Sequence, residues 1–206
     1  FNYASAAVDG RAARDPEGLA IAWEGEDGDV RRYSNEELRA AVDLAAGMLR
    51  AHGVRAGDRV GFLLPMLPET AIAVLALGKL QAIFTPIFSG YGAPAVAARL
   101  ADCEASVLIT ADGFRRRGGI VRLKDVADAA VAAAPTVREV LVVRRLGEAP
   151  GEMSWKPGRD VWWDEALADP VVEPLRETPQ TDPETPYVLI YTSGTTGPPK
   201  GCMIRH

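Results

Sequence analysis

The first regular stretch of apolar positions in the chain recurs every three to four residues, which is the period of a helix face. This stretch, Leu38 to Leu49, follows Ser34 and Glu37 at the spacing of a capping box. At its other end His52 is followed by Gly53, and glycine accepts the left-handed conformation in which many helices end. We therefore expect a helix that begins after Ser34 and ends at His52.

Two shorter elements precede that helix. The segment from Tyr3 to Arg14 is rich in alanine and stops at turn residues, which is typical of a short helix. The apolar segments 19–23 and 30–33 flank an acidic tip that contains Asp27 and Gly28. Because Asp-Gly supplies the positive φ angles of a tight turn, these segments predict a β-hairpin.

After Val54 short apolar runs alternate with longer amphipathic segments. The runs predict strands at 58–64, 82–86, 106–110 and 139–143, and the segments between and after them predict helices at 69–80, 94–103 and 123–133. Apolar strands that alternate with helices indicate a mainly parallel sheet covered on both faces. We expect an α/β fold with α/β/α layers.

Residues 147–183 form a long connection rich in Pro, Glu, Asp and Gly, with one short helix expected at 164–168. We place a first α/β subdomain at 1–180 and the start of a second subdomain at 181–206. Phe1 is no initiator methionine, and the alternating segment 201–206 looks like a strand that needs a partner. We expect the chain to be a fragment of a longer protein.

Composition excludes several classes of protein. Of the 206 residues 48% are hydrophobic and 25% charged, which is ordinary for a globular protein, and the net charge of −5 with basic residues clustered only at Arg115 to Arg117 argues against nucleic-acid binding. No apolar run reaches the roughly 20 residues of a membrane span, and no secretory signal is visible. Cys103 and Cys202 lack the spacing of a disulfide framework or a zinc site, so we expect a cytoplasmic protein.

A segment rich in glycine and hydroxyl groups follows the expected strand 187–191. Its glycines let the backbone approach a ligand, its hydroxyls can donate to phosphate oxygens, and Lys200 adds positive charge. The kinase-type P-loop does not fit, because Pro199 stands where that motif needs glycine and Gly201 where it needs Ser or Thr. The pattern predicts a polyphosphate-binding loop between two strands.

The run from Tyr191 to Gly201 resembles the signature of the adenylate-forming superfamily, which includes acyl-CoA synthetases, luciferases and peptide-synthetase adenylation domains. The resemblance implies that the loop holds the β- and γ-phosphates of ATP, with Mg²⁺ bridging phosphates, while a carboxylate attacks the α-phosphate. It implies phosphate-binding roles for Thr192, Ser193, Gly194, Thr195, Thr196, Gly197 and Lys200.

Other segments are similar to the acetyl-CoA synthetase branch of this superfamily. They are 1–4, 57–60, 64–69, 82–91 and 99–102. The branch implies that Phe88, Ser89, Gly90 and Arg116 contact the nucleotide of CoA.

A second arginine of the branch falls on Gly119, so Arg115 or Arg117 could take its place. A guanidinium suits the 3′-phosphate of CoA because it forms paired, charge-assisted hydrogen bonds. A solvated basic loop at 113–119, without any ligand, is the alternative interpretation.

Some residues are better explained by structure than by chemistry. His206 stands where the family often has the histidine of a Thr-His pair, but Arg205 replaces the threonine, and a strand-end histidine explains it equally well. Tyr91, Trp162 and Trp163 are large aromatics that we assign to the core. No catalytic residue is assigned within the chain.

The resemblance implies the first part of an enzyme that converts a short- or medium-chain carboxylic acid, ATP and CoA into acyl-CoA, AMP and pyrophosphate. Two alternatives stay open: an adenylation enzyme that loads a carrier protein, and a non-catalytic module that binds nucleotide or CoA. Without the groups that the family carries beyond His206, we expect the chain alone to be inactive.

Overall fold

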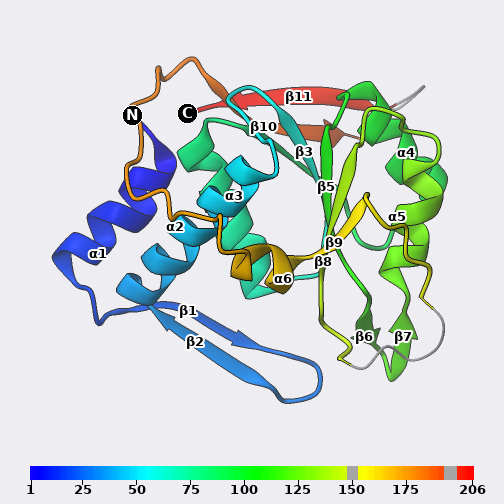
Figure 1. Cartoon of the computed structure of the whole chain (residues 1–206), viewed down its shortest axis with the longest axis horizontal. Helices are drawn as coiled ribbons and strands as arrows, with labels where there is room; N and C mark the ends of the chain where they lie inside the picture. Colours follow the sequence, from blue (N-terminus) through cyan, green and yellow to red (C-terminus); the bar gives the residue numbers. More distant parts are fainter. Residues whose placement is uncertain (148–152, 193–198) are drawn as a thin grey trace.

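A seven-stranded sheet lies at the centre of the computed structural model, which describes residues 1–147, 153–192 and 199–206 (Figure 1). Its strand order is β11-β10-β4-β3-β5-β8-β9. Every neighbouring pair from β10 to β9 is parallel, and β10 and β11 are antiparallel. The strands are β3 Arg59–Leu63, β4 Ile83–Pro86, β5 Val107–Ala111, β8 Glu139–Val143, β9 Asp160–Trp162, β10 Pro186–Thr192 and β11 Lys200–Arg205.

Helices cover both faces of this sheet, which confirms the α/β prediction. Helix α3 (Pro68–Leu80) leads from β3 to β4, whereas α4 (Ala93–Asp102) leads back across β3 to β5. Because such crossovers are right-handed, this reversal of direction puts the two helices on opposite faces. Helix α2 (Asn35–Ala51) packs against α3, and α5 (Leu123–Val131) packs against α4 (Figure 1).

The remaining helices lie beside α2. They are η1 (Ser5–Asp9), α1 (Gly10–Arg14) and α6 (Trp163–Ala168). Within the three described ranges, no helix is both long enough and apolar enough to cross a bilayer.

The capping box of α2 is confirmed. The Ser34 hydroxyl accepts the Glu37 amide proton at 3.2 Å, and the Glu37 carboxylate accepts the Ser34 amide proton at 2.8 Å. His52 is the C-cap, and Gly53 has a φ of +83°. The sequence therefore predicted both ends of this helix.

The hairpin of β1 (Leu19–Glu24) and β2 (Val30–Ser34) is also present, but its turn is wider than expected. The Gly25 amide donates to the Asp29 carbonyl at 2.8 Å, so the loop holds residues 25–29. Gly28 has a φ of +79°, whereas Asp27 stays in the ordinary region. The expectation of a tight Asp-Gly turn was wrong, because the Gly28 amide donates to the Gly25 carbonyl at 3.0 Å and so makes Glu26 and Asp27 the central turn residues.

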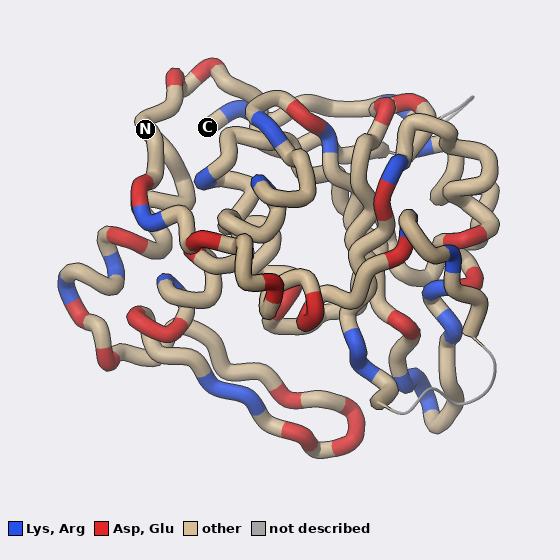
Figure 2. The backbone as a smooth tube through the Cα atoms, viewed as in Figure 1, with Lys and Arg blue, Asp and Glu red and all other residues tan. Residues whose placement is uncertain are grey.

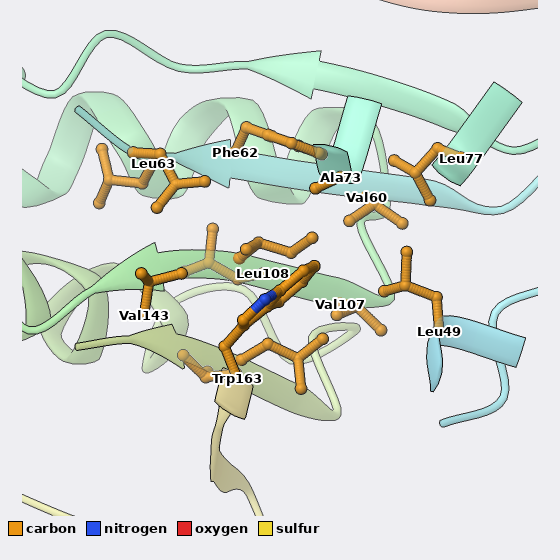
Figure 3. Packing of buried hydrophobic residues seen from close by; sticks show 14 of the residues in the cluster. Leu49, Val60, Phe62, Leu63, Ala73, Leu77, Val107, Leu108, Val143 and Trp163 are labelled. Carbon is orange, nitrogen blue, oxygen red and sulfur yellow. The ribbon is translucent and has the colours of Figure 1, made fainter. Parts of the chain in front are cut away.

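The core lies between the sheet and its helices (Figure 3). All of β5 is buried, as expected for a strand with helices on both faces. In β3, a Cβ on Gly61 would lie 2.4 Å from the Leu100 side chain, so the glycine lets α4 approach the sheet closely. Val60, Leu63, Leu77 and Leu108 are buried in this core (Figure 3).

Three short strands were not expected. Strands β6 (Phe114–Arg116) and β7 (Gly119–Val121) form a hairpin where the sequence suggested a basic loop. Its two turn residues, Arg117 and Gly118, have φ of 52° and 76°, as in a type I′ turn. The third strand is β9, which adds to the sheet beside β8.

Strand β10 has neighbours on both sides, and one of them is the strand expected at 201–206. It pairs with β11 along its length and meets β4 at Val188 and Phe84. Every residue of β11 is exposed. The described residues place 186–192 and 200–205 in the same sheet as the first subdomain, and the proposed boundary near residue 180 stays a prediction.

Candidate functional site

Several parallel strands end at one cavity of about 380 Å³. Ligands in open α/β sheets bind outside the carboxyl ends of strands, so this edge is the natural place for a site. The segments after β3, β4, β5 and β8 each contribute side chains to the wall. They contribute Pro65, Met66 and Leu67, then Phe88 and Ser89, then Phe114, Arg115 and Arg116, and finally Arg145.

The buried carboxylate of Asp112 fixes the backbone at this edge. Its Oδ1 accepts the amide protons of Gly113 at 2.7 Å and Arg145 at 2.9 Å, and its carboxylate also binds the Leu146 amide at 3.2 Å. Asp112 therefore ties the end of β5 to the end of β8. This sets the start of the β6–β7 hairpin, which carries two cavity arginines.

The β1–β2 hairpin forms the opposite wall. The Trp23 indole donates to the Met66 carbonyl at 2.7 Å, and the guanidinium carbon of Arg145 lies 5.2 Å from the Trp23 ring centroid. Arg145 also forms a bidentate pair with Asp27, with both distances at 2.9 Å. The hydrogen bonds from Arg145 lower the pKa of Asp27 to about 2, so the pair stays charged at neutral pH.

Opposite charges gather around this end of the molecule. Figure 2 shows acidic residues at the tip of the β1–β2 hairpin and basic residues along the β6–β7 hairpin. Asp27 already neutralises Arg145, whereas no ion pair is formed by Arg115 or Arg116 among the described residues. Those two arginines can therefore accept an anionic ligand.

The structure brings three of the four predicted CoA residues together. Phe88, Ser89 and Arg116 line the cavity. Gly90 does not line it, but a Cβ at that position would lie 2.5 Å from the Phe88 ring, so the glycine permits the turn. Of the two candidate replacements for an arginine at 119, Arg115 lines the cavity, and Arg117 stands outside it in the hairpin turn.

The predicted phosphate loop is described only at its two ends. Thr192 and Lys200 face each other across β10 and β11, and both are exposed. The strand that begins at Lys200 contradicts the kinase-type P-loop, in which a helix follows the lysine. Predicted residues outside the described ranges are Ser193, Gly194, Thr195, Thr196 and Gly197.

A second cavity, of about 450 Å³, adjoins the first and shares Pro65, Met66, Phe88 and Ser89 with it. Its wall also includes Tyr91, Arg99 and Tyr191, which sequence reasoning did not assign to any site. The assignment of Tyr91 to the core was wrong, since its side chain is 37% exposed. Trp163, in contrast, is buried as expected.

His206 is held by aromatic rings. Its ring centroid lies 5.2 Å from that of Tyr3 and 5.1 Å from that of Tyr187, and its Nδ1 accepts the Tyr3 amide proton at 3.4 Å. Burial lowers the pKa of His206, with a smaller contribution from the amino group of Phe1. These contacts favour the packing role over the catalytic one.

Family comparison agrees with this geometry. The family model described as AMP-binding enzyme matches residues 8–206. The chain therefore belongs to the AMP-binding enzyme family, whose members are adenylate-forming enzymes.

Similar proteins of known name indicate the branch of the family to which the chain is most similar. Acetyl-coenzyme A synthetase of Streptomyces avermitilis is 46% identical over 186 residues, which cover 90% of this chain and 28% of that protein. The enzyme of the same name from Mycobacterium tuberculosis H37Rv is 46% identical over 188 residues, with the same coverage of 90% and 28%. These matches confirm the resemblance to synthetases of the acetyl-CoA type.

A solved structure supports the fold. Acetoacetyl-CoA synthetase from Streptomyces lividans superposes with a TM-score of 0.85 at 32% identity, over 98% of this chain and 30% of that one. The chain thus spans less than a third of the length of these relatives.

Proposed function

We propose that the chain is the first part of an AMP-forming acyl-CoA synthetase for a short- or medium-chain carboxylic acid such as acetate. In this reaction the carboxylate displaces pyrophosphate from ATP to give an acyl-adenylate. The CoA thiol then displaces AMP to give the thioester. The names of the relatives, acetyl-coenzyme A synthetase, support an acetate-like substrate.

The observation that carries the proposal is the meeting of Phe88, Ser89, Arg115 and Arg116 in one cavity at the carboxyl ends of the strands. Two guanidinium groups, a hydroxyl and an aromatic ring match a phosphorylated nucleotide, which offers anionic oxygens and a flat base. In our proposal this cavity binds the nucleotide of CoA. Arg115 takes the role of the second arginine of the branch, whose position is occupied by Gly119 in this chain.

The phosphate-binding segment is proposed to hold ATP. Thr192 and Lys200 pair where β10 ends and β11 begins, so the hydroxyl and the ammonium would flank the phosphates. No group of three or more His, Cys, Asp or Glu in the described ranges could hold a metal ion. Mg²⁺ would instead arrive with ATP, since it is commonly bound through substrate phosphates and water.

The other features of the proposal follow the family. The groups that would carry out the chemistry are proposed to lie in sequence beyond these 206 residues, and here we assign only binding residues. A cytoplasmic location is proposed from the two free cysteines, Cys103 and Cys202.

The test is an ATP–pyrophosphate exchange assay on the protein extended to the length of its relatives, with acetate, propionate and butyrate. We expect acid-dependent exchange without CoA, and AMP release only when CoA is added. Exchange without any response to CoA, but with transfer to a carrier protein, would instead identify a carrier-loading enzyme. Binding of CoA without pyrophosphate exchange would identify a non-catalytic module that binds CoA.

A further inference from the structure

Tyr191 links the end of β10 to helix α4. Its hydroxyl donates to Asp102 Oδ2 at 2.5 Å, although the two residues are 89 positions apart. Tyr191 is two positions before Ser193, where the predicted phosphate-binding segment continues. The last residue of α4 therefore holds the strand end from which that segment departs.

Arg99, one helical turn before Asp102, continues this link on the inner side of α4. It is 6% exposed and donates to the Ala95 carbonyl at 2.7 Å. Its guanidinium carbon lies 4.5 Å from the Tyr91 ring centroid and 5.8 Å from that of Tyr191. Within the described ranges it forms no ion pair, so ring faces and a carbonyl stabilise this buried cation.

Tyr91 extends the contact to the CoA turn. Its ring meets that of Phe88 edge to face, with 5.5 Å between centroids. Phe88 lines both cavities, including the one that holds Arg115 and Arg116. A continuous series of contacts thus runs from Asp102 and Tyr191 through Arg99 to the turn at 88–91.

We propose that Asp102 and Arg99 are positioning residues that couple the ATP site to the CoA site. Asp102 fixes Tyr191 and so the strand end that enters the phosphate segment. Arg99 joins Tyr191 to Tyr91 and so fixes the separation of the two sites. This inference rests on the proposed function of both sites, but its structural part can be measured without catalysis.

The first experiment is a double-mutant cycle in the full-length protein. Tyr191→Phe removes only the hydroxyl, and Asp102→Ala removes its acceptor. Each should raise the KM for ATP in pyrophosphate exchange about 3- to 10-fold, the range that one hydrogen bond supports, with the CoA KM changed less than about twofold. The double variant should be no worse than the more affected single variant.

Glu104→Ala is the matched control. Glu104 is also a carboxylate just beyond α4, but it is exposed and pairs with Arg59 at 3.2 Å, away from both sites. It should leave both KM values unchanged. Equal effects of Glu104→Ala and Asp102→Ala on the KM for ATP would show that the loss of any negative charge near the end of α4 is enough. That result would overturn the proposal.

The second experiment separates Arg99 from Asp102. Arg99→Met keeps an unbranched apolar stem but loses the guanidinium and its charge, and it should raise the KM for both ATP and CoA. Arg99→Lys keeps the charge near the rings and should restore part of the loss. A purely structural role would lower the melting temperature of Arg99→Met with both KM values unchanged, and that result would refute the coupling.

Amide hydrogen exchange provides the readout that needs no activity. Asp102→Ala should speed exchange at Thr192, and Arg99→Met should also speed it at Tyr91, whose amide bonds to the Phe88 carbonyl at 3.0 Å. Protection in β5 should persist as proof of folding. If wild type shows no acid-dependent pyrophosphate exchange while these amides respond, the proposed function fails and the link stands. If exchange at both positions is unchanged, the link is absent.

Discussion

At the scale of single residues, the backbone decides which of three adjacent arginines can serve a ligand. Arg115 and Arg116 lie on β6 and line the cavity, but Arg117 occupies the turn with a φ of 52°. The resemblance singles out Arg116, but it leaves Arg115 and Arg117 as alternatives for the second arginine until the type I′ turn is known. The hairpin places Arg115 at the cavity and Arg117 outside it.

We predict that Arg116→Ala raises the KM for CoA about 10-fold or more, because a charge-assisted pair with a phosphate is lost. ATP–pyrophosphate exchange should change little, since CoA takes no part in it. Arg117→Ala is the control, because it removes the same charge from the same hairpin but outside the cavity. Equal effects of the two variants on CoA, or equal damage to both half-reactions by Arg116→Ala, would contradict the assignment.

Lys200, a residue of the proposed ATP site, lies directly across from Thr192. We predict that Lys200→Ala weakens ATP use and slows adenylate formation by about 10-fold or more, since a charge next to phosphates is removed. Pyrophosphate exchange at varied ATP measures both effects. A variant that matches wild type in this assay would show that Lys200 does not bind phosphate.

At the scale of elements, the long connection after α6 is held against α2 at a glycine. A Cβ on Gly47 would lie 2.0 Å from the Glu173 carbonyl oxygen, and the next contact of this segment is the Leu175 amide, which donates to the Asp43 carbonyl at 2.8 Å. Lys79, fully buried, binds Asp43 at 2.5 Å in the same place. The connection is therefore packed structure, although its composition suggested a loop.

We predict that Gly47→Ala lowers the free energy of unfolding by about 1–3 kcal/mol, because overpacking against backbone outweighs the better helix propensity of alanine. Gly10→Ala is the matched control in the helical segment α1. There the nearest atom to a Cβ is the Ser5 carbonyl oxygen at 3.4 Å, so the change should stabilise by up to about 1 kcal/mol. Urea unfolding of both variants should give opposite signs, and a stabilised Gly47→Ala would refute the close packing.

Helix α2 and strand β8 are joined by His52, whose Nδ1 lies 2.6 Å from Glu139 Oε1. This hydrogen bond raises the pKa of His52 above its ordinary value of 6.5, although partial burial opposes it. Because the folded pKa is raised, the stabilisation is complete below pH 6.5 and is lost as the pH rises through the folded pKa.

We therefore predict that the stability advantage of wild type over His52→Gln shrinks as the pH rises from about 6 to about 8.5. Unfolding free energies measured across this range test it. In a Glu139→Gln background the same substitution should show no such dependence. An advantage that grows with pH would mean that the pKa of His52 is lowered instead.

The elements that could be predicted carry their signals locally. The ends of α2 follow from Ser34, Glu37 and Gly53, and β3, β5 and β8 from uninterrupted apolar runs. Strand β9 has three residues and depends on Asp160, whose carboxylate accepts from the buried Lys124 at 2.8 Å. Such long-range pairs leave no periodic pattern, and neither does the bond between Tyr191 and Asp102.

At the scale of the whole molecule, the parallel topology explains why distant motifs serve one site. Strands β3, β4, β5, β8 and β10 all point the same way, so the segments after them meet at one edge of the sheet. The sequence predicted the parallel sheet, and three of the four residues that it assigned to CoA line one cavity. It could not predict the two cavities, because their walls come from segments far apart in the chain, such as Glu26 and Arg145 in the first and Phe62 and Tyr191 in the second.

The last prediction concerns the 206-residue chain by itself. We predict that it releases no AMP in a CoA-dependent way from acetate, propionate or butyrate, because catalysis requires the carboxylate, the α-phosphate and the reacting groups in one geometry. The chain includes the proposed phosphate-binding residues Thr192 and Lys200 but spans only 28% of its relative from Streptomyces avermitilis. Calorimetry should also show weak ATP binding.

The assay needs one control, because an acetate-activating enzyme of the expression host could copurify. A Lys200→Ala chain prepared in parallel reports that background, since any contaminant is unaffected by the substitution. AMP release above this background, dependent on CoA, would show that these 206 residues contain a complete active site. The reacting groups would then have to be sought among the side chains of the two cavities, beginning with Tyr91, Arg99 and Tyr191.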